Sequence, residues 1–239
     1  MSTTETYNRI AARHYAAYRP PLHTLILRRL IRPGERFRLG LDVGCGTGYS
    51  TIALAPFCDR VIGLDPSPEM LASASPHPSV EYRQGSGERL EALPMSQCGI
   101  VTFAGSLHYA KSEGLRLELL RMCPAACVIL SYDFDVLTRE ILEELGVVWE
   151  VVTSGYDHRV NCSDWNGFTE ESVDSGRVEL NSTREEIAHL LLADSNHYHA
   201  LSKRYRCEDP YELLVNDLGR RTEKTILRAE IYLARFHVG

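Results

Sequence analysis

The sequence predicts an α/β fold with a seven-stranded, mostly parallel sheet, an antiparallel last strand and a helical cap. Three observations lead to this prediction. Strand-like and helix-like segments alternate between Arg38 and Leu145, which is typical of parallel strands joined by crossover helices. Three glycines follow the first strand, at the place where open α/β sheets bind ligands. The final segment alternates apolar and polar side chains, as a half-exposed antiparallel strand does.

Each element has its own signal in the sequence. Short apolar runs predict five strands, at residues 38–43, 60–64, 80–83, 100–104 and 126–132. Apolar residues at helical spacing predict helices at 49–57, 67–73, 113–122 and 135–145. Beyond the polar segment 146–172, we expect a strand at 173–180, one helix that carries Ile187 to Tyr205, a helix at 209–220 and the last strand at 225–236. The helix with Ile187 is expected to have Ser182 or Thr183 as its cap.

We expect a single domain made of four consecutive parts. Two amphipathic helices, separated by "YRPP", form an N-terminal lid. A ligand-binding core, a cap inserted after the fifth strand, and the last strand follow this lid. The expected boundaries are 1–33 for the lid, 34–145 for the core, 146–222 for the cap and 223–239 for the last strand.

Composition and charge limit the classes of partner. With 44% hydrophobic and 24% charged residues, the chain is typical of a globular protein. A formal net charge of -6 opposes extended contact with nucleic acid. We therefore expect a small-molecule substrate and a monomer or homodimer. The sequence has no apolar run that would span a membrane and starts without a secretory signal, which predicts a cytoplasmic location.

The cysteines and histidines show no metal-binding pattern. The seven cysteines include no C-x-x-C pair and have no ordered spacing, so we expect reduced thiols. His197 and His199 lie two residues apart and therefore point to different faces of a helix, which argues against a shared metal. No metal site is predicted.

The stretch "LDVGCGTGYS" raises the question of which ligand its glycines hold. Gly44, Gly46 and Gly48 allow a ligand to lie against bare backbone. No lysine follows Gly48, which excludes a P-loop, and the glycine spacing differs from the dinucleotide fingerprint. Asp65 ends the second strand, where a carboxylate can accept hydrogen bonds from both ribose hydroxyls.

Together these motifs resemble class I S-adenosylmethionine-dependent methyltransferases, which have a Rossmann-like fold. "LDVGCGTG" is similar to the first motif of that family, "VIGLDPSPEML" to the second, and "VEYRQGSGERLEALPM" to the adenine-binding turn after the third strand. "VTFAGSLHYA" resembles the motif of the fourth strand. The opening "YNRIAARHYAAYRPP" and the closing "EIYLARF" resemble the subgroup that includes trans-aconitate-type methyltransferases.

The resemblance implies roles around S-adenosylmethionine and its product S-adenosylhomocysteine. The three glycines would pack against the methionine and ribose portions, and Asp42 would order the loop or contact the amino acid end. Asp65 would hold the ribose diol, and Met70 would lean on the adenine. Many relatives carry an Asp where this chain has Ser86, so a neutral hydroxyl is expected at the adenine amino group. The predicted cofactor-binding residues are Asp42, Gly44, Cys45, Gly46, Gly48, Asp65, Pro66, Met70, Ser86, Gly87 and Ser106.

Candidates for catalysis and substrate binding rest on the chemistry of methyl transfer. This in-line displacement at a sulfonium chiefly needs alignment and exclusion of water. His108, expected at the end of the fourth strand, is a candidate base, with a hydrogen-bonded pocket wall as the alternative. Tyr15 is the second catalytic candidate because aromatic faces attract cations, with core packing as the alternative. The segment "GYDHRV" either faces the substrate or is a polar surface loop. The predicted substrate-binding residues are Tyr18, Arg19, Tyr109, Tyr132 and Tyr156.

The sequence therefore predicts methyl transfer to a small organic molecule. Arg19 near the expected lid favours a carboxylate acceptor, which would become a methyl ester. A tRNA- or protein-modifying methyltransferase is one alternative, against which the net charge of -6 counts. A non-catalytic S-adenosylmethionine-binding scaffold or regulator is another, because fold does not fix function.

Overall fold

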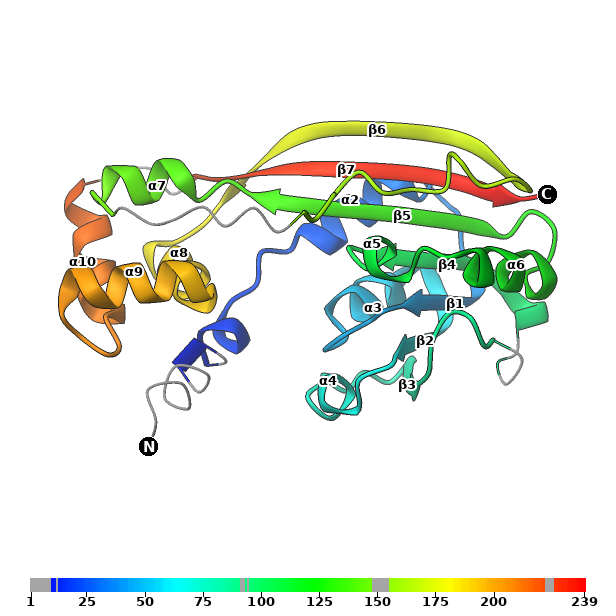
Figure 1. Cartoon of the computed structure of the whole chain (residues 1–239), viewed down its shortest axis with the longest axis horizontal. Helices are drawn as coiled ribbons and strands as arrows, with labels where there is room; N and C mark the ends of the chain where they lie inside the picture. The colour runs from blue at the N-terminus through cyan, green and yellow to red at the C-terminus, as the bar shows by residue number, and fades with distance from the viewer. Residues whose placement is uncertain (1–9, 12, 91–92, 94, 148–154, 222–225) are drawn as a thin grey trace. The chain divides into compact units, whose positions relative to one another are not determined.

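The computed structural model describes residues 10–11, 13–90, 93, 95–147, 155–221 and 226–239. In this part of the chain, seven strands form one sheet in the order β3-β2-β1-β4-β5-β7-β6 (Figure 1). The first five strands pair in parallel, whereas β7 runs against both of its neighbours. The predicted sheet is confirmed. Its strands are β1 (Phe37–Val43), β2 (Cys58–Asp65), β3 (Val80–Gln84), β4 (Cys98–Ala104), β5 (Val128–Val136), β6 (Phe168–Asn181) and β7 (Ile226–Val238).

Most of the predicted helices occur close to their predicted positions. Residues 10–11 and 13–17 are helical, and Tyr7 of the first predicted helix lies outside the described residues. Short 3-10 turns cover Ala55–Phe57 (η1) and Met95–Gln97 (η2). The α-helices are α2 (Leu22–Leu30), α3 (Tyr49–Leu54), α4 (Pro68–Ala72), α5 (Leu107–Ala110), α6 (Glu113–Met122), α7 (Arg139–Glu144), α8 (Arg184–Ala193), α9 (Ser195–Tyr205) and α10 (Tyr211–Arg221).

Two helix predictions need correction. The helix expected from Ile187 to Tyr205 is two helices, because Asp194 is extended (φ -88, ψ 134) and its side chain accepts hydrogen bonds from the amides of Asn196 and His197. A carboxylate that caps a new helix in this way ends the preceding one. The helix expected at 135–145 is shorter, because β5 continues to Val136 and the Leu137 amide still bonds to the Arg228 carbonyl at 2.8 Å.

The chain divides into two compact units. The sheet unit comprises Pro21–Asp135, Tyr156–Gly176 and Ile231–Gly239, and the helical unit comprises residues up to Pro20, Val136–Gly155 and Arg177–Glu230. Each unit therefore joins segments that are far apart in the sequence. The expected boundaries of lid, core, cap and last strand stay predictions.

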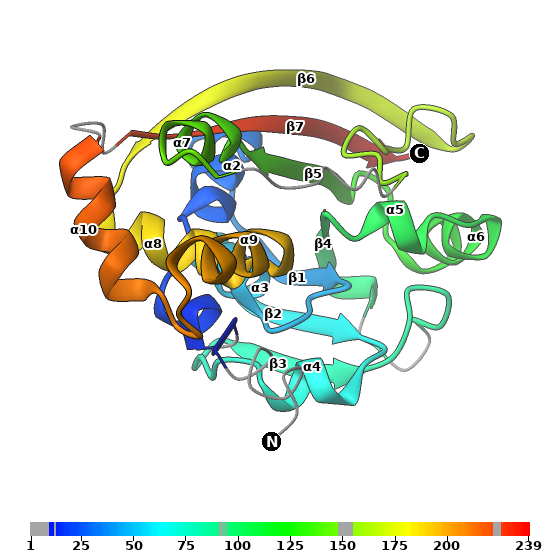
Figure 2. The same ribbon diagram turned by 60° about the vertical axis from the view of Figure 1, so that its left-hand side comes forward.

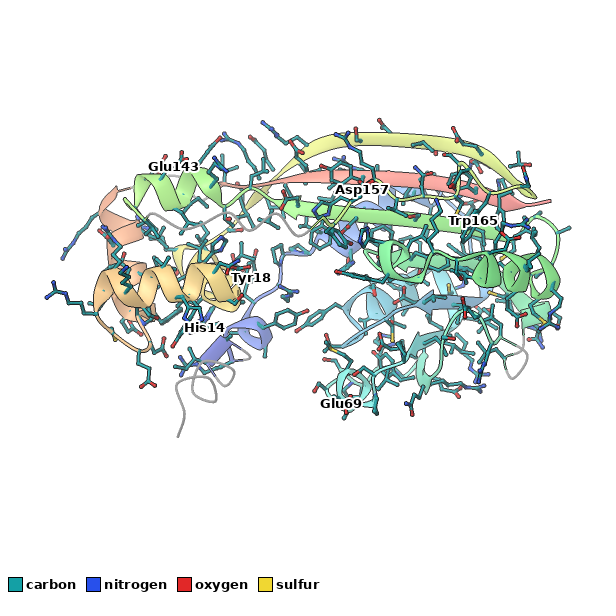
Figure 3. The ribbon with its side chains drawn as sticks, in the orientation of Figure 1. His14, Tyr18, Glu69, Glu143, Asp157 and Trp165 are labelled. Atoms are coloured by element: carbon teal, nitrogen blue, oxygen red, sulfur yellow. The ribbon has the colours of Figure 1, made fainter. Side chains whose placement is uncertain are left out.

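The sheet unit has its core where apolar strands meet α6. The register sets Leu41 of β1 beside Ile62 of β2 and Val101 of β4. These buried side chains form one cluster with Leu115 and Leu119 of α6. Trp165, labelled in Figure 3, packs in the same cluster. A continuous apolar core of this kind fixes the ends of the parallel strands, which is where the site lies.

A buried ion-pair cluster holds β7 in the sheet unit. Arg235 is only 2% exposed. Its guanidinium donates to Glu35 at 2.6 Å, to Glu171 at 2.7 Å and to the Leu30 carbonyl at 2.9 Å. Burial opposes ionisation of both glutamates, but the bonds from Arg235 outweigh it and lower the pKa of each carboxyl. This cluster ties β7, β6 and the end of α2 together.

The helical unit packs α8, α9 and α10 around an apolar centre that includes Leu191, Leu201 and Leu214 (Figure 2). Beside this centre lies a histidine cluster: His14, labelled in Figure 3, is fully buried, with its Nδ1 2.8 Å from Nδ1 of His189 and its Nε2 3.3 Å from Asp209. The predicted cap of α8 is Thr183. No helix in the described ranges has the length and apolar character needed to cross a membrane.

Candidate active site

The loop between β1 and α3 is built by glycines in the left-handed region. Gly44, Gly46 and Gly48 have φ values of 72, 54 and 87. A Cβ on Gly48 would lie 2.1 Å from the Tyr82 hydroxyl, whereas a Cβ on Gly46 would meet no atom within 4 Å. Gly48 is therefore required for packing, and Gly46 leaves an open face on the loop.

Asp42 supports this loop from below. It is fully buried and accepts hydrogen bonds from the hydroxyls of Ser50 at 2.6 Å, Thr51 at 2.7 Å and Thr102 at 2.7 Å. Burial raises the pKa of Asp42, and the three hydroxyl donors oppose this shift. Asp42 thus orders the loop, which is one of the two roles predicted for it.

Asp65, at the end of β2, has both carboxylate oxygens fixed by backbone amides. Oδ2 accepts from the Gly46 amide at 2.8 Å, and Oδ1 accepts from the Ser67 amide at 2.9 Å. Each oxygen keeps a further acceptor site. The carboxylate is therefore held in place and can still accept hydrogen bonds from a ligand.

A cavity of about 680 Å³ opens at the ends of β1, β2 and β4. Among the predicted cofactor-binding residues, those that line it are Gly44, Gly46, Asp65, Pro66, Met70, Ser86, Gly87 and Ser106. Asp42, Cys45 and Gly48 instead lie in or beneath the loop, and burial raises the pKa of the Cys45 thiol to about 12. A volume of this size is within the usual range for cofactor sites.

Sequence reasoning missed several residues of the cavity wall. They include Glu88 after β3, Gly105 after β4, and Ser112 before α6. The Ser112 hydroxyl caps α6 by accepting from the Leu115 amide and donates to a carboxylate oxygen of Glu88. Glu88 lies only two residues beyond the predicted Ser86, but its bond to Ser112 depends on the fold and left no signal in the sequence.

His108 does not stand where it was predicted. β4 ends at Ala104, and His108 and Tyr109 lie on α5, which the sequence did not reveal. Tyr109 lines the cavity, whereas His108 does not. Nδ1 of His108 accepts a hydrogen bond of 3.2 Å from the amide of Asp157, which Figure 3 labels. In the neutral ring Nε2 therefore carries the proton, and His108 has no free nitrogen to act as a base.

A hydrogen-bonded cluster lies next to the cavity wall and joins three segments of the sheet unit. The Tyr156 hydroxyl is 2.6 Å from the carbonyl oxygen of Gly105, a wall residue, and 2.7 Å from Oδ2 of Asp133. His158 places Nδ1 2.9 Å from the same Asp133 oxygen. Because the carboxylate accepts, Nδ1 of His158 carries the proton and Nε2 keeps a free lone pair in the neutral ring.

Tyr156 stays protonated in this cluster. Burial, followed by the bond to Asp133, raises the pKa of the Tyr156 phenol. Its hydroxyl therefore acts as a donor. The cluster assigns "GYDHRV" a defined place beside the site, which the sequence left open between substrate contact and surface loop.

The other predicted residues lie away from the cavity wall. Tyr132 is buried in the sheet unit, with its hydroxyl 3.2 Å from Nδ1 of His23. Tyr15, Tyr18 and Arg19 belong to the helical unit. The Arg19 guanidinium lies 3.5 Å from the centre of the Tyr15 ring, and the Tyr18 hydroxyl is 3.1 Å from that of Ser182. Their roles in substrate binding and catalysis stay predictions.

Sequence comparisons identify the domain that carries this cavity. A family of methyltransferase domains matches residues 41–123. The chain is 33% identical over 75 residues to a protein of Dictyostelium discoideum named as a methyltransferase, which is 31% of this chain and 28% of that protein. It is 28% identical over 110 residues to a Saccharomyces cerevisiae protein named as an S-adenosylmethionine-dependent methyltransferase, 43% of this chain and 38% of that protein.

A third relative is the ubiquinone biosynthesis O-methyltransferase of Azorhizobium caulinodans, 37% identical over 67 residues, which is 26% of each chain. The matches thus span between 26% and 38% of the length of these three relatives.

Solved structures are similar over most of the chain. A type II methyltransferase of Anaeromyxobacter dehalogenans superimposes with a TM-score of 0.59 and 21% identity, over 92% of this chain and 96% of that chain. The phosphoethanolamine N-methyltransferase 2 of Haemonchus contortus, in complex with S-adenosylhomocysteine, has a TM-score of 0.50 and 16% identity, over 89% of this chain and 52% of that chain.

Residues 41–123 thus form a methyltransferase domain. Its cofactor is S-adenosylmethionine, and the cavity of the methyltransferase domain fits this group. Asp65 offers acceptors for the ribose hydroxyls, the open face of Gly46 leaves room against the backbone, and Met70 offers an apolar surface for the adenine. The predicted class and cofactor are thus confirmed.

Proposed function

We propose that the protein transfers a methyl group from S-adenosylmethionine to a small organic molecule, with a carboxylate as acceptor and a methyl ester as product. The observation that carries this proposal is the cavity in which the fixed Asp65 carboxylate adjoins the open face of Gly46. When bound, S-adenosylmethionine supplies an electrophilic methyl group on a sulfonium. The residues of the chain hold it, align the acceptor and exclude water.

The choice of a carboxylate is supported by the state of His108. Methyl transfer to a carboxylate needs no base, because the acceptor arrives ionised. His108, the candidate base of the sequence, has its Nδ1 occupied by the Asp157 amide. In the described part of the chain the Arg19 guanidinium lies over the Tyr15 ring and has no carboxylate partner, so it is suited to pair with an acceptor carboxylate.

Two further facts support a small acceptor and transfer to oxygen. The net charge of -6 disfavours a tRNA acceptor. The relative from Azorhizobium caulinodans is named an O-methyltransferase of ubiquinone biosynthesis. The resemblance of the chain ends to trans-aconitate-type methyltransferases agrees with an organic acid, and we propose membership of that subgroup.

A second acceptor class is favoured by one observation. The bond to Asp133 engages Nδ1 of His158, so that Nε2 carries a lone pair in the neutral ring, and Tyr156 links Asp133 to Gly105 of the cavity wall. Such a lone pair suits an acceptor that must lose a proton. A phenol is such an acceptor. Transfer to phenols and not to carboxylic acids would therefore replace the carboxylate proposal and point to His158.

The test is calorimetric titration of S-adenosylmethionine and S-adenosylhomocysteine, followed by transfer of a radiolabelled methyl group to a panel of small carboxylic acids and phenols. We expect binding that D65A weakens by about thirtyfold or more, because charged hydrogen bonds to the ribose are lost. The matched control is D59A, which removes an exposed aspartate of the same strand that pairs with Arg36. If neither S-adenosylmethionine nor S-adenosylhomocysteine binds to the unaltered protein, the proposal is wrong.

A further inference from the structure

The cavity wall holds two charged side chains among the residues the structure describes there, Asp65 and Glu88. Asp65 is matched to the ribose hydroxyls. Glu88 has no ion-pair partner in the described ranges, where its carboxylate instead accepts a hydrogen bond at Oε1 from the Ser112 hydroxyl. A carboxylate without a cationic partner on a ligand cavity is suited to accept hydrogen bonds from the ligand.

Glu88 is held in a defined position by the start of α6. Ser112 links the Glu88 carboxylate to the Leu115 amide in the first turn of that helix. Gly114 leaves room for this approach, because a Cβ there would lie 3.0 Å from Oε1 of Glu88. The second oxygen, Oε2, accepts no hydrogen bond from the described part of the chain. Glu88, although exposed, is thus oriented by Ser112 and keeps an acceptor oxygen for a ligand of the cavity.

The order of the strands decides which part of the cofactor Glu88 meets. Asp65 is the last residue of β2, whose neighbours are β3 on one side and β1 on the other. In S-adenosylmethionine the adenine and the methionine part are attached at opposite ends of the ribose and extend in opposite directions. The open glycine loop follows β1, whereas Ser86, Gly87 and Glu88 follow β3. The wall after β3 is therefore the adenine side, and the hydrogen-bond donor that adenine offers there is its exocyclic amino group.

We propose that Glu88 recognises the exocyclic amino group of adenine, supplying the carboxylate that the sequence lacks at Ser86. The inference rests on the proposed function, because it takes S-adenosylmethionine as the ligand of this cavity. It makes Glu88, supported by Ser112, a specificity-determining residue for the base. Ser86 then lines the same wall but does not determine the preference for adenine over other purines.

The test compares three probes by calorimetry: S-adenosylhomocysteine, S-inosylhomocysteine, in which an oxygen replaces the adenine amino group, and 5′-methylthioadenosine, which lacks the amino acid part. The unaltered protein should prefer the adenosyl over the inosyl compound by about tenfold or more, because the carboxylate would face an acceptor oxygen in the latter. In E88Q this preference should fall to about twofold or less, since the amide can also donate to the oxygen.

Two comparisons distinguish adenine recognition from a contact with the amino acid part of the cofactor. E88Q should weaken S-adenosylhomocysteine and 5′-methylthioadenosine by the same factor; if only the former is weakened, Glu88 pairs with the ammonium group and the inference is wrong. E113Q is the matched control, because Glu113 pairs with Arg116 on the same helix and lies outside the cavity wall. It should keep the full base preference.

Further outcomes separate this inference from the function itself. If S86A abolishes the base preference while E88Q keeps it, Ser86 is the discriminating residue and the assignment to Glu88 is overturned. The same holds if the unaltered protein binds both homocysteine compounds equally well. If it binds none of the three probes, the proposed function fails together with the inference.

Discussion

The sheet unit and the helical unit bury their polar groups in different ways. In the sheet unit the buried Asp42 and Asp65 are surrounded by hydroxyls and amides, and Arg235 is surrounded by carboxylates and a carbonyl. In the helical unit the buried polar groups include the imidazole of His14, which contacts a second imidazole, His189. The sheet unit thus keeps fixed charges ready for a ligand, whereas the helical unit holds groups that change protonation near neutral pH.

The largest expected effect comes from removing the buried ion pairs of the sheet unit. R235M removes the guanidinium and leaves Glu35 and Glu171 without their main partner. We expect a loss of about 3 kcal/mol in the free energy of unfolding, measured by urea denaturation. R177M is the control, because Arg177 forms an exposed pair with Glu230 and should change the value by less than about 1 kcal/mol. Equal effects would mean that the Arg235 cluster is not a special feature of the sheet unit.

The second prediction concerns pH and distinguishes the two units directly. Burial lowers the pKa of His14 and of His189 below the ordinary value of 6.5. The unfolded chain then binds more protons, so the stabilisation is full above pH 6.5 and is lost as the pH falls below it. For Glu35 and Glu171, whose pKa values are lowered from 4.5, the loss begins only below about pH 4.5.

Hydrogen exchange at pH 7.5, 6.0 and 5.0, corrected for intrinsic rates, measures this difference. Peptides of α8 and α10 should lose protection first, with a cost on the order of 1 kcal/mol across this range, while peptides of β1 and β4 keep theirs. H189Q should reduce this pH response, and H199Q, at an exposed position of α9, should leave it unchanged. Simultaneous loss of protection in both units would contradict this contrast between them.

The smallest expected effect comes from the helix cap at the start of α8, in the helical unit. Thr183 and Glu186 form a reciprocal cap at the start of α8: the Thr183 side chain accepts from the Glu186 amide at 3.2 Å, and the Glu186 side chain accepts from the Thr183 amide at 2.8 Å. T183A should cost about 0.5 kcal/mol, visible as faster exchange in α8. T183S keeps the hydroxyl and should behave as the unaltered protein. An equal change in β1 would mean that the two units unfold as one.

Much of the fold could be predicted from the sequence because single segments carry strong local signals. Apolar runs located β1 to β5 to within a few residues, and α6 matches its predicted bounds of 113–122. Periodicity failed at Asp194, since apolar residues continue at helical spacing on both sides of the break. The local signal was Asp194 itself, a good helix cap directly before Ser195.

The sequence predicted only those parts of the site whose signal lies within a single segment. The glycine loop and Asp65 each have a signal in one short segment, and the structure places Gly44, Gly46 and Asp65 at the cavity. Glu88 acquires its place through Ser112, and the cluster of Tyr156, Asp133 and His158 is assembled from two segments of the sheet unit. Such contacts arise from tertiary packing, which no spacing of residues in a single sequence records.

The seven cysteines give the protein a built-in reporter of its own integrity. All are free thiols, and Cys207 is the one that is not buried. A maleimide dye should therefore modify one thiol in the native chain and all seven after denaturation, so that a simple mass measurement separates folded from damaged preparations. Because Cys207 belongs to the helical unit, a dye placed there would follow that unit during turnover without any engineered cysteine.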